Sequence, residues 1–350
     1  MKRRDKPGVR DVGLCRQCSK FLRRLLISIK EKDDIVVKAE YATRSKTMYT
    51  RMLIPLDGSA TAEGVLPYAR TLARGLSLPV ELLGVVDIAA IATHVSRGTA
   101  RHFDAIITEN VRGSEDYLKR IAETFPGASA KCTVERGTPE EVILERAVPD
   151  TTLIAMATHG RSGMNRFLMG SIAEKVLRAA TTSILLIRPN EGDKSDGEAS
   201  LNSVIVPLDG SELAETALGP VTELAKALKL DVELIRAYQI PVNTYAAGEA
   251  YYPIDYEAIR SALKDEAQSY VEKIAGELKA MGVAKVSFAI PEGFGADEII
   301  AVGQKTPNNL IAMCTHGRSG VKRWVLGSVT EKVVRHSGDP VLVLPHGATA

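Results

Sequence analysis

The chain has 350 residues, of which 45% are hydrophobic and 25% are charged. This length exceeds one typical domain of about 100–200 residues, and the composition is that of a folded globular protein. With 45 Lys and Arg against 43 Asp and Glu, the formal net charge is +2, which gives no reason to expect a nucleic-acid or membrane partner. The 4 cysteines are too few for a disulfide framework, and no apolar run approaches the roughly 20 residues that span a bilayer. We therefore expect a cytoplasmic protein built from two domains.

The first 47 residues are strongly basic, with a cluster at Lys2-Arg3-Arg4. Cys15 and Cys18 have the spacing of a zinc knuckle, but they supply only two of the roughly four ligands that a tetrahedral zinc site needs. Residues 21–26 could form a short basic amphipathic helix that contacts an anionic surface or a partner. The interpretation that we favour is an extension, residues 1–47, with little fixed structure of its own.

Two motifs occur twice in the same order. Leu-Ile-Pro-Leu-Asp-Gly-Ser at residues 53–59 returns as Ile-Val-Pro-Leu-Asp-Gly-Ser at residues 205–211. Thr-His-Gly-Arg-Ser-Gly at residues 158–163 returns unchanged at residues 315–320, and both copies continue into a Gly-Ser pair and a Glu-Lys-Val triplet. Such a repeat indicates tandem domains joined by a polar linker rich in Gly, Ser and Asp. The predicted first domain, linker and second domain are residues 48–190, 191–201 and 202–346.

Short apolar runs alternate with longer stretches of helical periodicity in each copy, which is the pattern of a βαβ series. In the first copy we expect strands at residues 51–56, 80–86, 130–135, 152–157 and 183–188. Helices are expected there at residues 60–75, 100–124, 139–147 and 171–180. In the second copy we expect strands at residues 203–208, 231–237, 285–290, 309–314 and 340–344. Helices are expected there at residues 212–228, 255–281, 296–304 and 328–336. The fold class is therefore α/β, with two tandem open parallel five-stranded sheets that carry helices on both faces, as in Rossmann-like domains.

The fifth strand of each copy is apolar, Ile-Leu-Leu-Ile at residues 184–187 and Val-Leu-Val-Leu at residues 341–344. Each would be an exposed sheet edge unless another element covers it. We predict that the two strands pair with each other, so that the chain is an intramolecular pseudo-dimer. Whether two chains form a further homodimer stays open.

The strongest candidate for a ligand site follows the fourth strand. A glycine-bearing segment is followed by nine residues, then a Gly-Ser pair at the start of a helix. Glycines let backbone N–H groups approach an anion, and a helix N-terminus adds unpaired donors. This candidate phosphate site comprises Ala157, His159, Gly160, Arg161, Gly163, Gly170 and Ser171 in the first copy, and Gly317, Arg318, Gly320, Gly327 and Ser328 in the second.

A purely structural interpretation competes with this one. Ser171 with Glu174, and Ser328 with Glu331, fit the capping-box pattern Ser-x-x-Glu, which stabilises a helix start without any ligand. The presence of the long loop in both copies favours binding.

An aspartate closes the first strand of each copy, Asp57 and Asp209. Ligands of open parallel sheets lie outside the carboxyl ends of the strands, where the winding reverses. If the strand order is 3-2-1-4-5, the aspartate and the glycine loop flank one crevice, and the carboxylate can accept hydrogen bonds from a ribose or a base amino group. The alternative role of the aspartate is an Asx-turn or a cap for the first helix.

Pro-Leu-Asp-Gly-Ser after a first strand, together with Thr-His-Gly-Arg-Ser-Gly and the nine-residue spacing to Gly-Ser, resembles the universal stress protein family. The resemblance covers about residues 48–190 and 202–346. It implies a parallel sheet of order 3-2-1-4-5 and, in the ATP-binding branch, a motif of Gly-x-x-Gly, nine residues and Gly-Ser/Thr. By this analogy Asp57 and Val85 face the adenosine, while Gly160, Gly170 and Ser171 hold the phosphates. The corresponding residues of the second copy are Asp209, Ala237, Gly317, Gly327 and Ser328. The implied cofactor is ATP, alone or with Mg²⁺.

One position departs from this motif. Its first glycine is Ala157 in the first copy and Cys314 in the second. Alanine adds a methyl group, whereas cysteine adds a thiol close to the expected ligand, so ATP binding is expected more readily in the first copy. Cys314 is either a redox-sensitive thiol or inert packing, and the second interpretation is favoured for a cysteine at a buried strand end.

No catalytic motif accompanies the candidate phosphate site. His159 and His316 have no second metal ligand nearby in the sequence, and neither a Walker A motif nor a Gly-x-Ser-x-Gly elbow is present. We therefore expect a stress-response protein that binds an adenine nucleotide and has at most weak ATP hydrolysis. Two alternatives stay open: an enzyme that slowly hydrolyses ATP or adenylates a substrate, and an interaction module with empty pockets.

Overall fold

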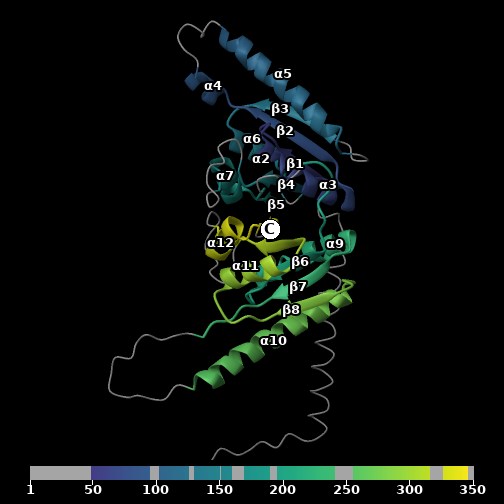
Figure 1. Ribbon diagram of the computed structural model, residues 1–350, viewed down its shortest axis with the longest axis vertical. Coiled ribbons are helices and arrows are strands. Elements are labelled where there is room, and N and C mark those ends of the chain that lie inside the picture. The colour runs from purple at the N-terminus through teal and green to yellow at the C-terminus, as the bar shows by residue number, and fades with distance from the viewer. Residues whose placement is uncertain are drawn as a thin grey trace, which may run out of the picture. The chain divides into compact units, whose positions relative to one another are not determined.

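The protein is described by a computed structural model, shown in Figure 1. The residues described are 49–94, 102–125, 130–149, 151–159, 169–189, 195–240, 255–315 and 326–345. The predicted N-terminal extension, residues 1–47, lies outside them.

Two successive halves contain the same series of elements. The strands of the first half are β1 (Arg51–Pro55), β2 (Val80–Val86), β3 (Ala130–Arg136), β4 (Thr152–Ala157) and β5 (Ile184–Ile187). Its helices are α2 (Ala60–Glu63), α3 (Leu66–Gly75), α4 (Ile88–His94), α5 (Phe103–Ala122), α6 (Pro139–Arg146) and α7 (Ser171–Ala179). The strands of the second half are β6 (Ser203–Pro207), β7 (Asp231–Ile235), β8 (Val286–Ala289), β9 (Asn309–Cys314) and β10 (Val341–Leu344). Its helices are α8 (Glu212–Glu215), α9 (Leu218–Leu228), α10 (Tyr256–Ala280), α11 (Gly295–Lys305) and α12 (Ser328–His336).

The strands form one sheet of 10 strands in the order β3-β2-β1-β4-β5-β10-β9-β6-β7-β8. Each half therefore has the expected order 3-2-1-4-5 with parallel neighbours, which confirms the α/β fold class. The two predicted five-stranded sheets are continuous with each other, because β5 and β10 join the halves into a single sheet. Their pairing is antiparallel, with Leu342 opposite Leu185, and it confirms the predicted pairing of the fifth strands.

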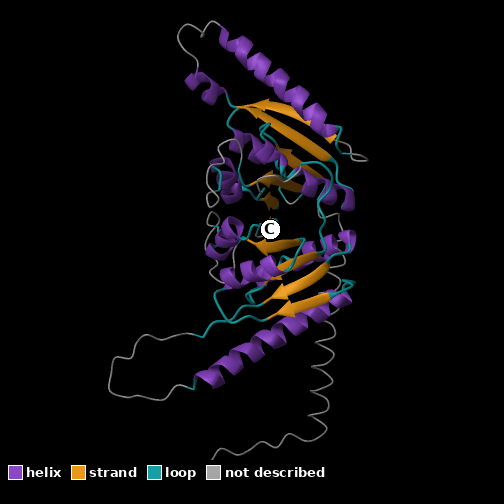
Figure 2. Cartoon of the chain, in the orientation of Figure 1, coloured by secondary structure: helices purple, strands orange, loops and turns teal. Residues whose placement is uncertain are grey.

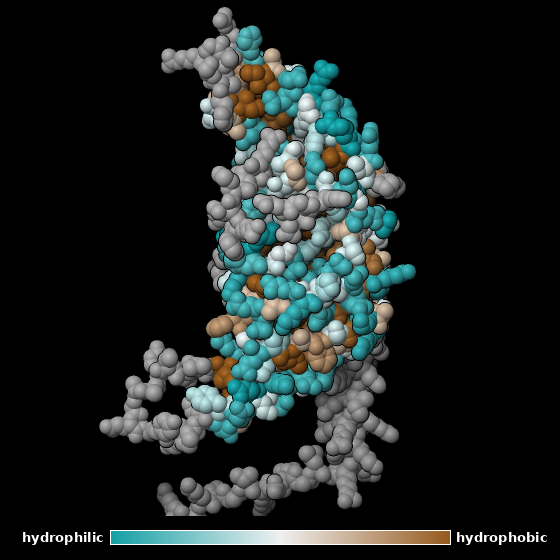
Figure 3. Space-filling view, viewed as in Figure 1, coloured by the Kyte–Doolittle hydropathy of each residue, from teal (hydrophilic) through white to brown (hydrophobic). Residues whose placement is uncertain are grey.

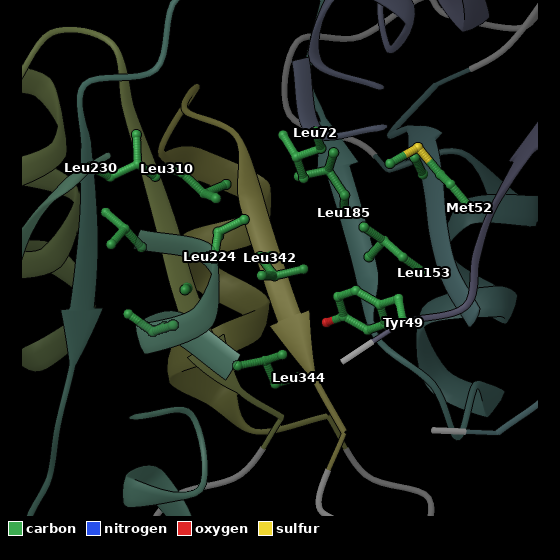
Figure 4. Packing of buried hydrophobic residues seen from close by; sticks show 14 of the residues in the cluster. Tyr49, Met52, Leu72, Leu153, Leu185, Leu224, Leu230, Leu310, Leu342 and Leu344 are labelled. Carbon is green, nitrogen blue, oxygen red and sulfur yellow. The ribbon is translucent and has the colours of Figure 1, made fainter. Parts of the chain in front are cut away.

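Helices cover both faces of this sheet (Figure 2). One apolar core lies on the face that α3, α5, α9 and α10 cover, and Figure 4 shows part of it around Leu185 and Leu342. A second core lies under α6, α7, α11 and α12. Strands with helices on both faces have no solvent side, which explains why β4 and β9 are buried along their whole length.

The outer surface has a different character from these cores. In the view of Figure 3 it is mostly hydrophilic, with hydrophobic side chains in small groups. Among the helices that the structure describes, none is both long and apolar enough to cross a lipid bilayer.

Two of the predicted helices are each divided in two. The helix expected at residues 60–75 consists of α2 and α3, and the one expected at 212–228 consists of α8 and α9. Pro67 and Pro220 explain the breaks, because a proline lacks the N–H that would bond four residues back and its ring collides with that carbonyl. The short helix α4 was not predicted.

The linker between the halves is anchored to α3 through Arg70, whose side chain is buried. Arg70 Nη1 donates to the carbonyl oxygens of Ser195 and Gly197 at 2.6 and 2.8 Å. Its Nη2 donates to Thr124 Oγ1 at 2.7 Å, and the guanidinium lies 5.3 Å from the ring centre of Phe125. The described part of the predicted linker is thus held against α3 by a buried charged side chain.

Replacing Arg70 by alanine should lower the free energy of unfolding by about 1.5–3 kcal/mol, the range for losing hydrogen bonds to a charged donor. Arg74→Ala is a matched control, because Arg74 lies on the same helix and pairs with Glu198 of the same linker, but its side chain is 70% exposed. Its loss should cost about 1 kcal/mol or less. Urea unfolding followed by circular dichroism measures both values, and equal losses would contradict a stabilising role for the buried contacts.

Candidate functional site

The carboxyl ends of β6, β7 and β9 border a cavity of about 320 Å³ in the second half. Four of the residues predicted to bind the nucleotide line it: Asp209, Ala237, Gly327 and Ser328. They come from the end of β6, from the residues after β7 and from the start of α12, so the fold brings together segments that are far apart in the sequence. Cys314, at the end of β9, lines the same cavity.

Further lining residues were not predicted from the sequence. They are Pro207, Leu208, Ala214, Ile235, Gly295, Ile299, Met313, Val329 and Thr330. Most of them are apolar or small, which gives the cavity an apolar wall beside the carboxylate and the glycine. Four of them come from α11 and α12, and a local sequence motif carries no signal for how these two helices pack.

The equivalent residues of the first half occupy the same positions in its sheet. Asp57 follows β1, Ala157 ends β4, and Gly170 and Ser171 begin α7. Leu83 of β2 pairs with Pro55 of β1, and Ile235 of β7 pairs with Pro207 of β6 in the same register. Val85 lies two residues after Leu83, as Ala237 lies two residues after Ile235. This register makes Val85 the counterpart of Ala237.

Some predicted residues cannot be placed. Gly160, Arg161, Gly163, Gly317, Arg318 and Gly320 lie outside the described residues, as does His316. The ends of both loops are described, however. Gly170 N donates to Thr158 O, and Gly327 N donates to Thr315 O, each at 2.8 Å, so the residues that flank the two loops are joined in the same way.

Both aspartates adopt the Asx-turn that was the alternative to a binding role. Asp57 Oδ1 accepts from Ser59 N at 2.9 Å and from Ser59 Oγ at 2.6 Å. Asp209 Oδ1 accepts from Ser211 in the same way, at 3.0 and 2.6 Å. The intervening Gly58 and Gly210 have φ values of 78° and 81°, a left-handed conformation that favours glycine. The Asp-Gly-Ser motif therefore has a structural role.

The capping-box interpretation of the two glutamates is wrong. The N-cap residues are Gly170 and Gly327, so Ser171 and Ser328 are the first helical residues and make no cap. A capping box needs the serine one position earlier in the helix. Helices α7 and α12 thus begin with a glycine that offers no side-chain acceptor for their first N–H groups.

The buried thiol of Cys314 is 6% exposed, and its Sγ lies 3.1 Å from Thr216 Oγ1. Burial raises the pKa of this thiol, so the reactive thiolate is disfavoured near neutral pH. This environment is that of a packing cysteine rather than a redox-sensitive one.

His159 is half-buried beside the loop. Its Nδ1 lies 3.0 Å from Thr158 Oγ1. Burial, and secondarily the charge of Arg188, lowers the pKa of His159, so the ring is neutral at neutral pH. Within the described residues, no group of three His, Cys, Asp or Glu side chains is arranged to hold a metal ion.

A tyrosine–glutamate pair near each aspartate was missed in the sequence. Tyr117 donates to Glu63 at 3.0 Å, and Tyr270 donates to Glu215 at 2.9 Å. Burial, followed by the glutamate, raises the pKa of each tyrosine. An alignment of the two copies against each other would have revealed the pairs, because all four residues occur at similar distances from the aspartates.

Comparisons with known proteins agree with the repeat. The sequence profile of the universal stress protein family matches residues 48–188 and 201–345. A universal stress protein of Methanocaldococcus jannaschii (MJ0531) is 32% identical over 149 residues, which cover 43% of this chain and 85% of that protein. One of Mycobacterium tuberculosis (Rv2005c) is 24% identical over 304 residues, which cover 83% of this chain and 96% of that protein. The crystal structure of a universal stress protein from Archaeoglobus fulgidus has the same fold, with a TM-score of 0.60 at 21% identity over 85% of this chain and 99% of that one.

Proposed function

Because the chain belongs to the universal stress protein family, we propose that it binds ATP and acts as a nucleotide-responsive regulatory protein. The observation that carries this proposal is the cavity in the second half, where a carboxylate, an apolar wall and an uncapped helix start meet. Its volume of about 320 Å³ lies within the range of roughly 300–1,000 Å³ for small-molecule pockets.

The two ends of the nucleotide would meet different parts of this site. Asp209 would accept hydrogen bonds from the adenosine, with Ala237 and its apolar neighbours beside the base. Gly327 and Ser328 would hold the phosphates, because the first N–H groups of α12 point along the helix axis and the helix dipole favours an anion there. In the first half Asp57, Val85, Gly170 and Ser171 would take the same roles.

The chemistry of the described pocket lining supports binding rather than catalysis. Its ionisable side chains are Asp209 and Cys314, and burial raises the pKa of the thiol. Asp209 is also committed through Oδ1 to Ser211. General acid–base catalysis needs a group poised to exchange a proton near the operating pH, and the raised pKa of the thiol works against that role. Slow ATP hydrolysis is the second candidate function.

Mass spectrometry of the purified protein after denaturation tests the proposal. We expect an adenine nucleotide to be released, and we expect calorimetric titration of the nucleotide-free protein with ATP to show saturable binding, measured with and without Mg²⁺. Continuous release of ADP over many turnovers would favour the enzyme instead. If no nucleotide is released and the titration shows no binding, the remaining interpretation is an interaction module with empty pockets.

A further inference from the structure

The Glu-Lys-Val triplet that recurs in both copies has no place in the pocket, yet each of its residues has a defined role. The valines, Val176 and Val333, are fully buried in the second core. Each lysine forms an ion pair with the neighbouring helix of its own half. Lys175 of α7 pairs with Glu140 of α6, and Lys332 of α12 pairs with Asp297 of α11 at 2.7 Å.

The glutamates connect the two halves. Within its own helix, Glu174 pairs with Arg178, and Glu331 pairs with Arg335, both at 3.0 Å. Between the halves, Arg335 Nη2 lies 3.4 Å from Glu174 Oε1, and Arg178 Nη2 lies 3.5 Å from Glu331 Oε1. Figure 1 shows α7 and α12 beside each other. We call these four residues the crossed charge cluster.

The cluster begins in the first turn of α7 and of α12, the two helices whose starts form the proposed phosphate sites. Glu174 is the fourth residue of α7, about 4.5 Å along the helix axis from Ser171, since each residue adds about 1.5 Å. A carboxylate in the first turn of a helix repels a polyphosphate bound at the start of that helix unless a cation neutralises it. Partial burial, with Glu174 35% exposed and Arg335 19% exposed in their side chains, limits the screening of that interaction by water and salt.

We propose that each half supplies the arginine that completes the neutralisation of the first-turn glutamate near the other half's phosphate site. Arg335 of the second half thereby favours anion binding in the first half, and Arg178 of the first half favours it in the second. Neither arginine touches the ligand, so both are positioning residues that act through a glutamate. The inference rests on the proposed function, because it concerns the same two sites.

Arg335 is the better residue to test. Its side chain is half as exposed as that of Arg178, at 19% against 39%, and Arg188 donates a hydrogen bond to its carbonyl oxygen. Removing Arg335 leaves Glu174 its ion pair with Arg178, so we expect a partial effect on the first-half site.

The experiment measures the affinity of the first-half site for ATP and, separately, for inorganic tripolyphosphate. A Gly327→Val background removes the second-half site from the titration. In that background Arg335→Gln should weaken binding of both probes by about three- to tenfold, and by more at low salt than at high salt. Lys332→Gln is the matched control, because it removes one positive charge and one ion pair from the same helix without contacting Glu174. It should change the affinity by about twofold or less.

Glu174→Gln separates an electrostatic role of Arg335 from a merely structural one. This variant should bind both probes more tightly, and adding Arg335→Gln to it should cost almost nothing further. If Arg335 only held α12 in place, its loss would cost the same with Glu174 or Gln at position 174.

Each remaining outcome is decisive. Equal losses for Arg335→Gln and Lys332→Gln, or an undiminished loss in the Glu174→Gln protein, would overturn the inference and leave ATP binding standing. A protein that binds tripolyphosphate but not ATP would overturn the proposed function. The inference would then be tested by the affinities of the same variants for tripolyphosphate. A wild-type protein that binds neither probe would overturn both.

Discussion

Gly170→Val is expected to abolish ATP binding in the first half without unfolding the protein. Gly170 has φ −60° and ψ 146°, an extended conformation that valine adopts without strain. Its N–H donates to Thr158 O, and valine keeps that donor. The fold should therefore tolerate the change, whereas the isopropyl group would occupy the space through which phosphate oxygens approach the start of α7. Losing two charge-assisted hydrogen bonds at about 1.5–3 kcal/mol each lowers the affinity by more than about a hundredfold.

Calorimetric titration with ATP measures this effect, and circular dichroism checks the fold. Gly327→Val is the matched variant of the second half, where the N-cap glycine has nearly the same conformation, φ −60° and ψ 141°. Its effect should be smaller if the thiol of Cys314 already hinders ATP. Unchanged affinity in folded Gly170→Val protein would remove the first half as a nucleotide site.

The sheet topology could be predicted because its signals are local and occur twice. The apolar runs and the helical stretches alternate in both copies, and each Asp-Gly-Ser motif forms the same turn after its strand. The pairing of β5 with β10 could also be predicted, since two apolar edges in one chain need a cover. The joining of the two sheets into one follows from that pairing.

The errors arose where one residue of offset, or contacts between distant elements, decided the outcome. Ser171 fits a capping box only if it precedes the helix, and the helix begins at Ser171 itself. Glu174 instead forms ion pairs with Arg178 and Arg335. The ion pair with Arg335 exists only because α7 and α12 come together when β5 and β10 pair. Arg70 gave no signal either, because its main acceptors are backbone carbonyls, which every residue possesses.

The aspartates show how one residue can satisfy two interpretations. Asp57 Oδ1 holds Ser59, and Ser59 Oγ in turn accepts from Ala62 N at the start of α2. The same relay runs from Asp209 through Ser211 to Ala214. A turn of this kind fixes the orientation of the carboxylate before any ligand arrives, and preorganised polar groups lose less freedom on binding. The Asx-turn is thus compatible with the proposed contact to the adenosine.

Leu185→Ala should lower the free energy of unfolding by about 2–5 kcal/mol, the range for truncating a buried leucine. Leu185 is fully buried on β5, and it lies opposite Leu342 of β10 (Figure 4). Leu342→Ala should cost a similar amount, and the double variant should cost less than the sum because both truncations open onto one shared cavity. Val148→Ala is the control, since Val148 is 51% exposed and its truncation should change the stability by about 0.5 kcal/mol or less.

The position of Leu185 makes its loss a test of how the halves depend on each other. The core cluster that contains Leu185 includes residues of both halves, among them Met52 of β1 and Val204 of β6. A defect at the junction of β5 and β10 should therefore weaken both halves. Hydrogen exchange of the Leu185→Ala protein should therefore speed up in β1 and in β6 alike, as it does when a cooperative unit opens. Loss of protection in β1 alone would mean that the halves are separate folding units, each stable without the other. In that case the crossed charge cluster, rather than the shared core, would be the contact through which one proposed nucleotide site influences the other.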